Sequence, residues 1–396
     1  MYPQGGFTGE EHMRRNRRTT IALAATATLL IAACGSDDSS SADTTEASSE
    51  TTEATTDTTD DMSSETTEAP DTTDAPETTD AEMAMGAAGF PECAELEGAT
   101  IGYSQPIPDP NFAIIDEIMA AQLDLIGADY VGVNAQFDPG KQVSDVQTLL
   151  QQGVSALIIN PVDPTVTVAA VQEFVDAGIP VVVQDTDNDG SYFTSVNADV
   201  VSAAQEGAAL LKELVGDGTV GVIIGPPFAT VLRRQADTFA AAAAEVGLNV
   251  IETQTSGNPG DPSAAQTIVE AWKQQAPDLA GIWTFNDTSA VGVAATFDDD
   301  FAPALVSMNG QPEAIPLVEG GRISATFDLQ QDMIARSLAF AAATAICGGE
   351  LPSDVWVQTK LIDATNFGDW VTPVDRGVES ELGLEEIDGK TFIVQK

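Results

Sequence analysis

Short apolar segments alternate with helix-like segments from about residue 99 onward, and this alternation constrains the fold more than any other feature of the sequence. The first four apolar runs lie at 101–104, 130–134, 156–160 and 179–185. The helix-like stretches between them lie at 112–126, 141–151 and 165–177. Short, continuous apolar runs are typical of strands buried on both faces of a parallel sheet, with helices supplying the connections. The pattern therefore predicts an α/β fold built from βαβ units.

The same pattern repeats in the second half of the chain. Its strands are predicted at 220–225, 250–255, 281–286 and 304–309. Its helices are predicted at 203–215, 232–246, 264–275 and 288–295, and a last helix and strand follow at 331–345 and 355–362. Roughly 300 residues are more than one parallel sheet usually holds as a single domain. We therefore expect two lobes of the same architecture, each with its own parallel sheet.

The first 33 residues have the composition of a targeting segment. Arginines precede an apolar run at 21–33 that ends at Cys34. The run is shorter than the ~20 residues that a membrane-spanning helix needs, and its basic start and small final residues are those of a secretory signal. Residues 31–34, Ile-Ala-Ala-Cys, resemble the lipobox of bacterial lipoproteins, in which the cysteine is lipidated. We predict a signal peptide over 1–33 and a lipid anchor on Cys34; a plain signal peptide with an uninvolved cysteine is the alternative.

Residues 34–88 form a low-complexity segment of Ser, Thr, Asp, Glu and Ala that contains no Lys or Arg. Such a composition cannot bury enough apolar surface to offset the chain entropy that folding would cost. We predict a self-repelling, extended tether that holds the folded domain away from a membrane. A calcium-binding or glycosylated stalk is the functional alternative. The protein is thus expected outside the cytoplasm, held at the cell membrane by its lipid.

Charge and histidine content argue against several classes of function. The chain carries 62 acidic and 15 basic residues, for a formal net charge of -47, and this excess of negative charge repels nucleic acids. Its single histidine, His12, lies in the segment predicted to be removed. The mature protein would then lack the imidazole of Ser/His/Asp and Cys/His catalytic sites and of histidine-containing zinc sites. We expect a protein that is not an enzyme and that holds no metal or cofactor.

Two cysteines, Cys93 and Cys347, remain beside Cys34. Predicted export places both of them in an oxidising compartment, where paired cysteines commonly form disulfides. A bond between them would tie the start of the folded domain to a late helix. Two unpaired, buried thiols are the alternative.

Polar residues follow the predicted strands at their carboxyl ends. They are Ser104, Asn134, Asn160, Asp185, Asn286 and Asn309. In open α/β sheets, ligands bind in the crevice beyond the carboxyl ends of the strands. Amides both donate and accept hydrogen bonds, and carboxylates are strong acceptors. Two lobes that face each other there would form a cleft suited to a neutral polyhydroxyl ligand rather than an ion.

Two local motifs lack the sequence context that their usual functions require. Residues 216–221 spell G-x-G-x-x-G, but a predicted helix precedes them and a strand follows, which is the reverse of a dinucleotide-binding fingerprint. Residues 185–190 look like the first half of an EF-hand loop, but the twelfth position is Val196 rather than glutamate. We interpret the first motif as a helix-ending turn. The second is interpreted as a polar turn whose first residue, Asp185, points into the cleft.

Arg233, Arg234 and Phe112 each have a functional and an ordinary interpretation. The adjacent arginines lie near the start of a predicted helix, and either one guanidinium reaches the cleft or both are solvated. Phe112 follows Asp109-Pro110-Asn111 directly after a strand. Aromatic rings pack against the C–H faces of sugars, so Phe112 is a candidate ligand contact as well as a candidate core residue.

Several segments, taken in order, resemble the periplasmic sugar-binding proteins of ABC transporters, of the ribose-binding type. The segments are Asp109-Pro110-Asn111-Phe112, Leu157 to Pro161, Ile179 to Asp185, Arg233 to Phe239, Phe285-Asn286-Asp287 leading into Gly292, and Ala325-Thr326-Phe327. The resemblance covers residues 98–362. It implies a type 1 periplasmic-binding-protein fold: two Rossmann-like lobes with parallel sheets, joined by three hinge crossovers and closing around a monosaccharide. It also implies permease subunits as partners.

The resemblance assigns ligand-binding roles position by position. The candidate ligand-binding residues are Asp109, Asn111, Phe112, Asp185, Arg233, Arg234, Gln235, Asn286, Asn309 and Gln330. Some positions depart from the family pattern. Asn309 and Gln235 stand where relatives carry an aspartate and an arginine, Thr186 stands where ribose binders carry arginine, and Leu329 falls where a glutamine is expected, with Gln330 beside it. A pentose other than ribose, a hexose, a polyol or a sugar derivative is therefore the expected ligand.

We accordingly expect a monomeric, substrate-binding lipoprotein that delivers a sugar or polyol to a permease. The N-terminal lobe is assigned to 89–198 plus 330–364 and the C-terminal lobe to 199–329 plus 365–396. Closure is expected at hinges near 197–201, 327–331 and 363–366. An extracytoplasmic sensor partner for a receptor, and a binder of nucleosides or other small polar solutes, are the alternatives. A glycosidase using Asp109 and Asp185 is a third.

Overall fold

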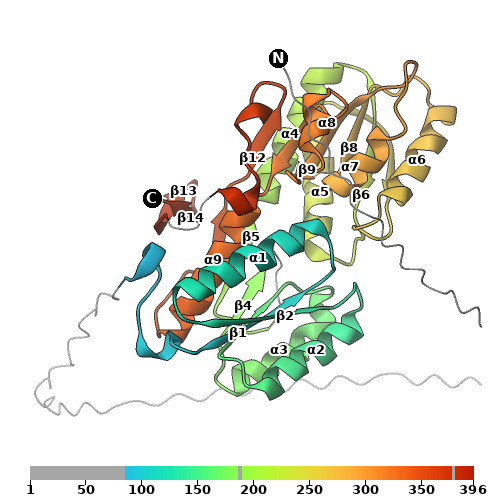
Figure 1. Ribbon diagram of the computed structural model, residues 1–396. Coiled ribbons are helices and arrows are strands. Elements are labelled where there is room, and N and C mark those ends of the chain that lie inside the picture. The colour runs from blue at the N-terminus through green and yellow to red at the C-terminus, as the bar shows by residue number, and fades with distance from the viewer. Residues whose placement is uncertain (1–84, 186–189, 377–379) are drawn as a thin grey trace, which may run out of the picture. The chain divides into compact units, whose positions relative to one another are not determined.

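The computed structural model describes residues 85–185, 190–376 and 380–396. Within them the chain forms two sheets, each covered by helices (Figure 1). The predicted signal peptide, Cys34 and the tether up to residue 84 lie outside the described residues. Thr186 and the rest of the polar turn at 186–189 lie outside them as well.

The first sheet has eight strands in the order β13-β14-β11-β5-β4-β3-β1-β2. Neighbouring strands run parallel, except that β13 and β14 form an antiparallel hairpin. The strands are β1 (Thr100–Gln105), β2 (Asp129–Asn134), β3 (Ala156–Ile159), β4 (Val181–Gln184), β5 (Thr194–Ala198), β11 (Asp354–Val357), β13 (Leu382–Ile387) and β14 (Lys390–Gln395). Every residue of β3 and β4 is buried, which is why the sequence there forms continuous apolar runs.

The second sheet has six strands in the order β12-β10-β9-β8-β6-β7. They run parallel except β12, which is antiparallel to β10. The strands are β6 (Thr219–Ile224), β7 (Asn249–Thr255), β8 (Gly281–Thr284), β9 (Ala304–Asn309), β10 (Ala325–Asp328) and β12 (Lys360–Asp363). The two sheets confirm the predicted α/β fold of two lobes, each with a largely parallel sheet. We call them the first lobe and the second lobe.

The helices begin at strong local signals. They are α1 (Pro110–Leu125), α2 (Pro139–Gln152), α3 (Pro164–Asp176), α4 (Val200–Val215), α5 (Thr230–Glu245), α6 (Pro262–Gln275), α7 (Asp287–Ala294), α8 (Ile315–Glu319) and α9 (Gln331–Ile346). Helices α1, α2, α3 and α6 each start with proline after a capping aspartate whose side chain accepts a main-chain N–H of the first turn. Each cap contributes about 1 kcal/mol, and proline at the first position costs no hydrogen bond.

The chain passes between the lobes at three short crossovers. It passes between them a fourth time between β12 and β13, which belong to different sheets. The first crossover, at residue 199, joins β5 to α4, and the second, at 329–330, joins β10 to α9. The third, at 358–359, joins β11 to β12, which belong to different sheets. A single strand over 355–362 and a third crossover at 363–366 were therefore wrong predictions. The polar residues Gln358 and Thr359 separate the two short strands.

The lobe assignment of the chain end also needs correction. Residues 365–396 were predicted to belong to the second lobe. Strands β13 and β14, which span 382–395, instead belong to the sheet of the first lobe. Strand β12 lies in the second lobe instead of the first. The reason is that β14 pairs with β11 at Trp356 and Phe392 and so extends the first sheet. Asp388 and Gly389, both with positive φ, form the two-residue turn of this hairpin.

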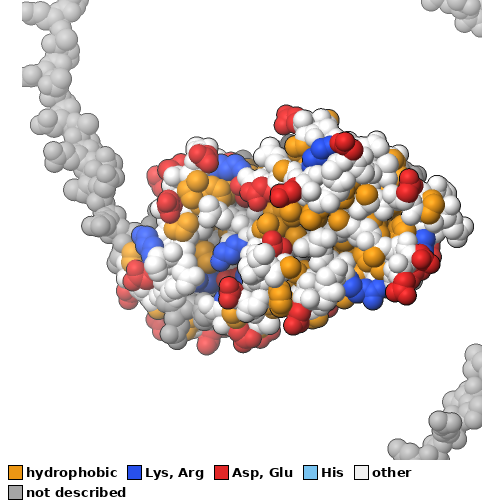
Figure 2. All heavy atoms as spheres, turned by 90° about the horizontal axis from the view of Figure 1, so that it is seen from above, with side chains coloured by type: hydrophobic (Ala, Val, Ile, Leu, Met, Phe, Trp, Pro, Cys, Tyr) orange, Lys and Arg blue, Asp and Glu red, His pale blue; other side chains and the backbone are white. Residues whose placement is uncertain are grey.

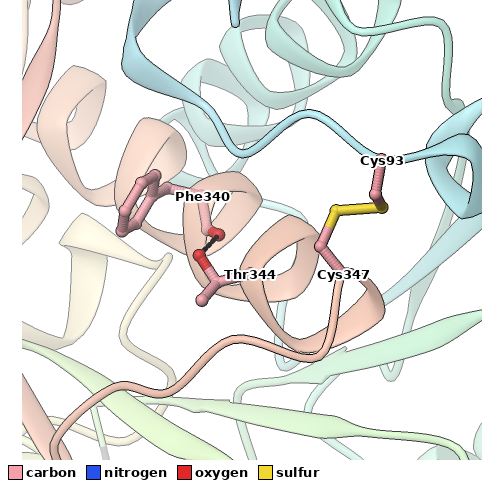
Figure 3. Close-up of a disulfide and its surroundings, with 4 residues drawn as sticks. All are labelled: Cys93, Phe340, Thr344 and Cys347. Atoms are coloured by element: carbon pink, nitrogen blue, oxygen red, sulfur yellow. Dashed lines mark hydrogen bonds between the residues drawn. A yellow bond between two sulfur atoms is a disulfide. The ribbon is translucent and has the colours of Figure 1, made fainter. Parts of the chain in front are cut away.

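A disulfide joins Cys93, just before β1, to Cys347 at the end of α9 (Figure 3). It links positions 254 residues apart, with the two Cα atoms 5.6 Å from each other. On the adjacent turn of α9, the Thr344 hydroxyl donates to the Phe340 carbonyl at 2.8 Å. The predicted pairing of these cysteines is confirmed.

Acidic side chains are spread over the face of the molecule seen in Figure 2 rather than gathered at one point. Basic side chains lie among them, and apolar side chains are exposed between them. Among the described residues, no helix has both the length and the apolar character needed to cross a membrane. The same residues contain no group of three or more His, Cys, Asp or Glu side chains placed to hold a metal ion.

Candidate ligand-binding cleft

A cavity of about 120 Å³ lies where the carboxyl ends of strands from both sheets meet. Its wall includes residues that follow β1, β3 and β4 in the first lobe and β6, β8 and β9 in the second. Val200, next to the first crossover, and Leu329, at the second, also line it. Phe137 of the first lobe and Phe228 of the second face each other beside it, with ring centroids 5.3 Å apart. The two lobes thus enclose this space together.

Most of the predicted ligand-binding residues line this one cavity. They are Asp109, Asn111, Phe112, Asp185, Gln235, Asn286 and Asn309. Arg233, Arg234 and Gln330 do not line it. Arg233 is exposed on α5, which corresponds to the solvated interpretation of that side chain, whereas Arg234 is half-buried. No Lys, Arg or His side chain from the described residues lines the wall.

Asp185 directly follows β4 and has a left-handed conformation, with φ of 55°. The main-chain N–H of Ala198 donates to its Oδ1 at 2.7 Å, and the Gln184 amide donates to its Oδ2 at 3.1 Å. Burial raises the pKa of Asp185, while these two hydrogen bonds and the charge of Arg234 act in the opposite direction. The carboxylate is therefore fixed in direction, and each oxygen still has room to accept another hydrogen bond.

Asp109 combines a structural role with a place in the cavity wall. Its Oδ1 accepts the N–H of Phe112 at 3.0 Å and so caps α1. Burial raises its pKa to about 6, although hydrogen bonds from the main chain of Phe112 and Asn111 lower it. The capped helix positions Phe112, which is 9 % exposed, on the same wall.

Two amide oxygens in the cavity wall are buried without a hydrogen-bond partner among the described residues. They are Asn111 Oδ1 and Gln235 Oε1. The orientation of the Gln235 amide is set by its nitrogen, which donates to the Phe285 carbonyl at 3.2 Å and contacts Met308 Sδ. Buried acceptors without a donor are costly, so both oxygens call for a ligand that donates hydrogen bonds.

Asn286 is already committed within the second lobe. Its Oδ1 accepts the Ser289 N–H at 2.9 Å, capping α7, and its Nδ2 donates to the Pro259 carbonyl at 2.8 Å. The side chain therefore holds the loop before α6 against the cavity. If Asn286 accepts a ligand hydroxyl as predicted, its Oδ1 must accept that hydrogen bond in addition to the one that caps α7.

Gln330 serves the crossovers instead of the cavity. Its Nε2 donates to the Gln358 carbonyl at 2.5 Å, which ties the second crossover to the third. Its main-chain N–H is bound by Asp328 Oδ1 at 2.7 Å. With φ of 54°, the backbone turns Gln330 away, and Leu329 takes the place at the wall.

Sequence reasoning missed much of the wall, and most of the missed residues are apolar. The missed residues are Pro106, Ile107, Phe137, Val162, Val200, Ala229, Thr230, Val231, Leu232, Pro259 and Leu329. Asn160, Pro161 and Phe285, which also line the cavity, lie in segments that the sequence had drawn attention to. Phe137 has a positive φ of 62°. The predicted clustering of polar residues at strand ends pointed to the right region but gave no sign of how apolar its surroundings are.

Comparisons with known proteins agree with this geometry. Residues 101–350 match the family model described as "Periplasmic binding protein domain". The ribose import binding protein of Bacillus subtilis (strain 168) is 29 % identical over 266 residues, which cover 66 % of this chain and 86 % of that protein.

Solved structures share the fold. A periplasmic solute-binding protein from Actinobacillus succinogenes, crystallised with D-allose, has a TM-score of 0.64 at 20 % identity. That match covers 69 % of this chain and all of that one. The myo-inositol-binding protein of Caulobacter, bound to myo-inositol, has a TM-score of 0.62 at 21 % identity. It covers 70 % of this chain and 97 % of that one.

Proposed function

Because the chain belongs to the family of periplasmic binding protein domains, we propose that it is the substrate-binding lipoprotein of an ABC transporter. It captures a sugar or sugar-like solute between its two lobes and delivers it to a membrane permease. One observation carries the choice of ligand: two carboxylates, Asp109 and Asp185, and two unpartnered amide oxygens converge on one enclosed cavity. Such a set of acceptors recognises a ligand that carries several hydroxyl groups.

Capture requires motion but no chemistry. The cavity wall is divided between lobes that are joined by crossovers of one or two residues, at 199, 329–330 and 358–359. Hinges of this kind absorb changes in φ and ψ while the sheets stay rigid. A ligand that contacts both walls binds the closed form better and shifts the population toward it. The contact between Phe137 and Phe228 contributes to the same closed form.

The attachment to the membrane is proposed from the sequence of the N-terminal segment. The lipobox-like residues before Cys34, followed by the acidic tether, fit a domain held outside the cell membrane. The Cys93–Cys347 disulfide supports an extracytoplasmic location, since disulfides persist in oxidising compartments.

Mutation of Asp185 tests the assignment of the site. We expect Asp185→Ala to lose binding of the cognate sugar, measured by titration calorimetry. The reason is that a ligand hydroxyl would lose its carboxylate acceptor. Asp237→Ala, on an exposed position of α5, is the matched control and should bind as the unmodified protein does. Circular dichroism and urea unfolding show whether each variant is folded. Unchanged affinity in a folded Asp185→Ala protein would refute the site.

A further inference from the structure

Two amide side chains of the second lobe that reach the cavity have nitrogens that are already engaged within the protein. The Gln235 nitrogen is held by the Phe285 carbonyl and Met308, and the Asn286 nitrogen is held by the Pro259 carbonyl. What Gln235 still offers is its oxygen, an acceptor. At Gln235 a ligand hydroxyl can donate to the protein, whereas the amide nitrogens of Gln235 and Asn286 are engaged elsewhere, and Asn309 is the remaining amide of this lobe in the wall.

The first turn of α5 forms a largely apolar part of the same wall. Ala229, Val231 and Leu232 all line the cavity, and Ala229 precedes the helix without a capping side chain. Thr230 is the one polar side chain of this turn in the wall. The other polar groups that the turn can add are main-chain N–H groups of the helix start, and Ala229, Val231 and Leu232 beside them offer a hydroxyl no partner.

Apolar residues from other elements line the same cavity. Val200 at the first crossover, Leu329 at the second and Val162 after β3 line the cavity too. Leu329 stands where the resemblance predicted a glutamine. A ligand carbon that faced this surface with a hydroxyl would bury it without a full set of partners, which costs about 1–3 kcal/mol. A methyl group at the same carbon would gain from leaving water.

The first lobe supplies both carboxylates of the wall, beside apolar residues of its own such as Ile107 and Phe137. Asp109, Asn111 and Asp185, all from the first lobe, present oxygens that accept hydrogen bonds. No Lys, Arg or His from the described residues lines the cavity, although the charge of Arg234, outside the lining, acts on Asp185. A carboxylate or phosphate on the ligand would therefore meet like charge at short range, which is unfavourable.

From the two carboxylates of the first lobe and the largely apolar first turn of α5 we infer the class of the ligand, an inference that rests on the proposed function. We propose that the solute is an uncharged sugar or polyol in which one hydroxyl is replaced by hydrogen or capped by a methyl group. Its remaining hydroxyls face the carboxylates of the first lobe. Its deoxy or methyl-bearing carbon faces the first turn of α5 and Leu329.

Matched pairs of sugars test the proposal directly. The pairs are D-fucose with D-galactose, D-quinovose with D-glucose, L-rhamnose with L-mannose, 5-deoxy-D-ribose with D-ribose, and pinitol with D-chiro-inositol. Titration calorimetry on the full chain gives the dissociation constant of each. We expect at least one deoxy or O-methyl member to bind about tenfold or more tightly than its parent, the usual discrimination for a single apolar group. D-Galacturonic acid should bind more weakly than D-galactose.

The outcomes separate this inference from the proposed function. If parent sugars bind and every one of them binds at least as tightly as its deoxy or O-methyl partner, the inference is overturned and the sugar-binding function stands. If no member of any pair binds, the proposed function fails and the inference fails with it. Tighter binding of D-galacturonic acid than of D-galactose would overturn the assignment of an uncharged ligand.

A conservative variant connects the preference to α5. Val231→Thr keeps the shape of the side chain but adds a hydroxyl to the apolar turn. We expect the preference for the deoxy sugar over its parent to fall several-fold in this variant. Val166→Thr, at a position on α3 that is 44 % exposed, is the matched control and should leave the ratio of the two affinities unchanged. An unchanged ratio in Val231→Thr would contradict the role given to this turn.

Discussion

Lys390 in the last strand and Asp199 at the first crossover form an ion pair of 2.8 Å, although they lie 191 positions apart in the sequence. The Lys390 ammonium also lies 4.6 Å from the centre of the Trp356 ring. Asp199 in turn caps α4 through Ser202. The C-terminal hairpin therefore braces the point where the chain first passes between the lobes.

Replacement of Lys390 tests this brace. Lys390→Met removes the charge but keeps much of the packing, and it leaves Asp199, whose side chain is 8 % exposed, without its cation. We expect the free energy of unfolding, measured in urea, to fall by about 1.5–3 kcal/mol, the range for hydrogen bonds to charged groups. The exposed Lys396 provides the control variant Lys396→Met, and equal losses in both variants would show that the pair contributes nothing.

A second cation braces the second crossover. Arg376 forms ion pairs with Asp328 at 2.5 Å and with Asp332 at 2.8 Å. Asp328 precedes the crossover at 329–330, and Asp332 follows it. The side chains of these aspartates are 1 % and 7 % exposed. Removing the cation leaves two buried carboxylates uncompensated, so Arg376→Ala should cost about 3–5 kcal/mol of stability.

Thermal and urea unfolding measure this loss. Arg322→Ala is the control, because Arg322 is exposed and its guanidinium donates to a carbonyl, that of Phe297. Restoring charge balance with the triple change Arg376→Leu, Asp328→Asn and Asp332→Asn should recover part of the stability. No recovery would mean that the loss came from packing rather than from the two carboxylates.

The disulfide should stabilise the domain strongly because it closes a long loop. For the 254-residue separation of Cys93 and Cys347, restriction of the unfolded chain corresponds to an upper value on the order of 5 kcal/mol. We expect the Cys93→Ala, Cys347→Ala protein to unfold at a clearly lower urea concentration, with ligand affinity unchanged since neither residue lines the cavity. A reductant should shift the unmodified protein in the same direction. Equal stability of the oxidised and reduced forms would contradict this expectation.

Asp287 makes part of the stability depend on pH. It is fully buried, and burial raises its pKa to about 7, although Ser307, Thr326 and the N–H of Gln311 donate to it. The folded protein therefore holds this proton more tightly than the unfolded chain does. Stability from the protonated form is complete below about pH 4 and is lost as the pH rises through 7.

The variant Asp287→Asn separates this contribution from that of the other acids. Its stability relative to the unmodified protein should improve as the pH rises from 4 to 7, by at most about 1.4 kcal/mol per pH unit. Urea unfolding at several pH values measures the difference. Asp237→Asn is the exposed control, and a difference that does not vary with pH would show that Asp287 is not protonated in the folded state.

The fold was largely predictable because its signals are local. Continuous apolar runs mark β3 and β4, and aspartate–proline pairs mark the starts of α1, α2, α3 and α6. The end of the chain was not predicted, since the sheet that β14 joins depends on pairing with β11, a contact that no local pattern encodes. The Asp388-Gly389 turn was the available signal for that hairpin.

The candidate site was predictable only in part, for a related reason. Strand ends and family segments located Asp109, Asp185 and Gln235. The first turn of α5 and Leu329 reach the cavity through the packing of the lobes, so sequence reasoning did not reveal the apolar wall. The left-handed φ of Gln330 likewise moved a predicted ligand contact to the crossovers.

The most direct test of the account is a thermal-shift screen of the purified protein against sugars, polyols, nucleosides and amino acids, with calcium as a separate condition. A ligand that binds only the folded state raises the melting temperature by mass action. The account predicts a concentration-dependent rise with one class of sugar or polyol, and loss of that rise in Asp185→Ala. A rise with nucleosides or amino acids and none with any sugar or polyol would contradict it.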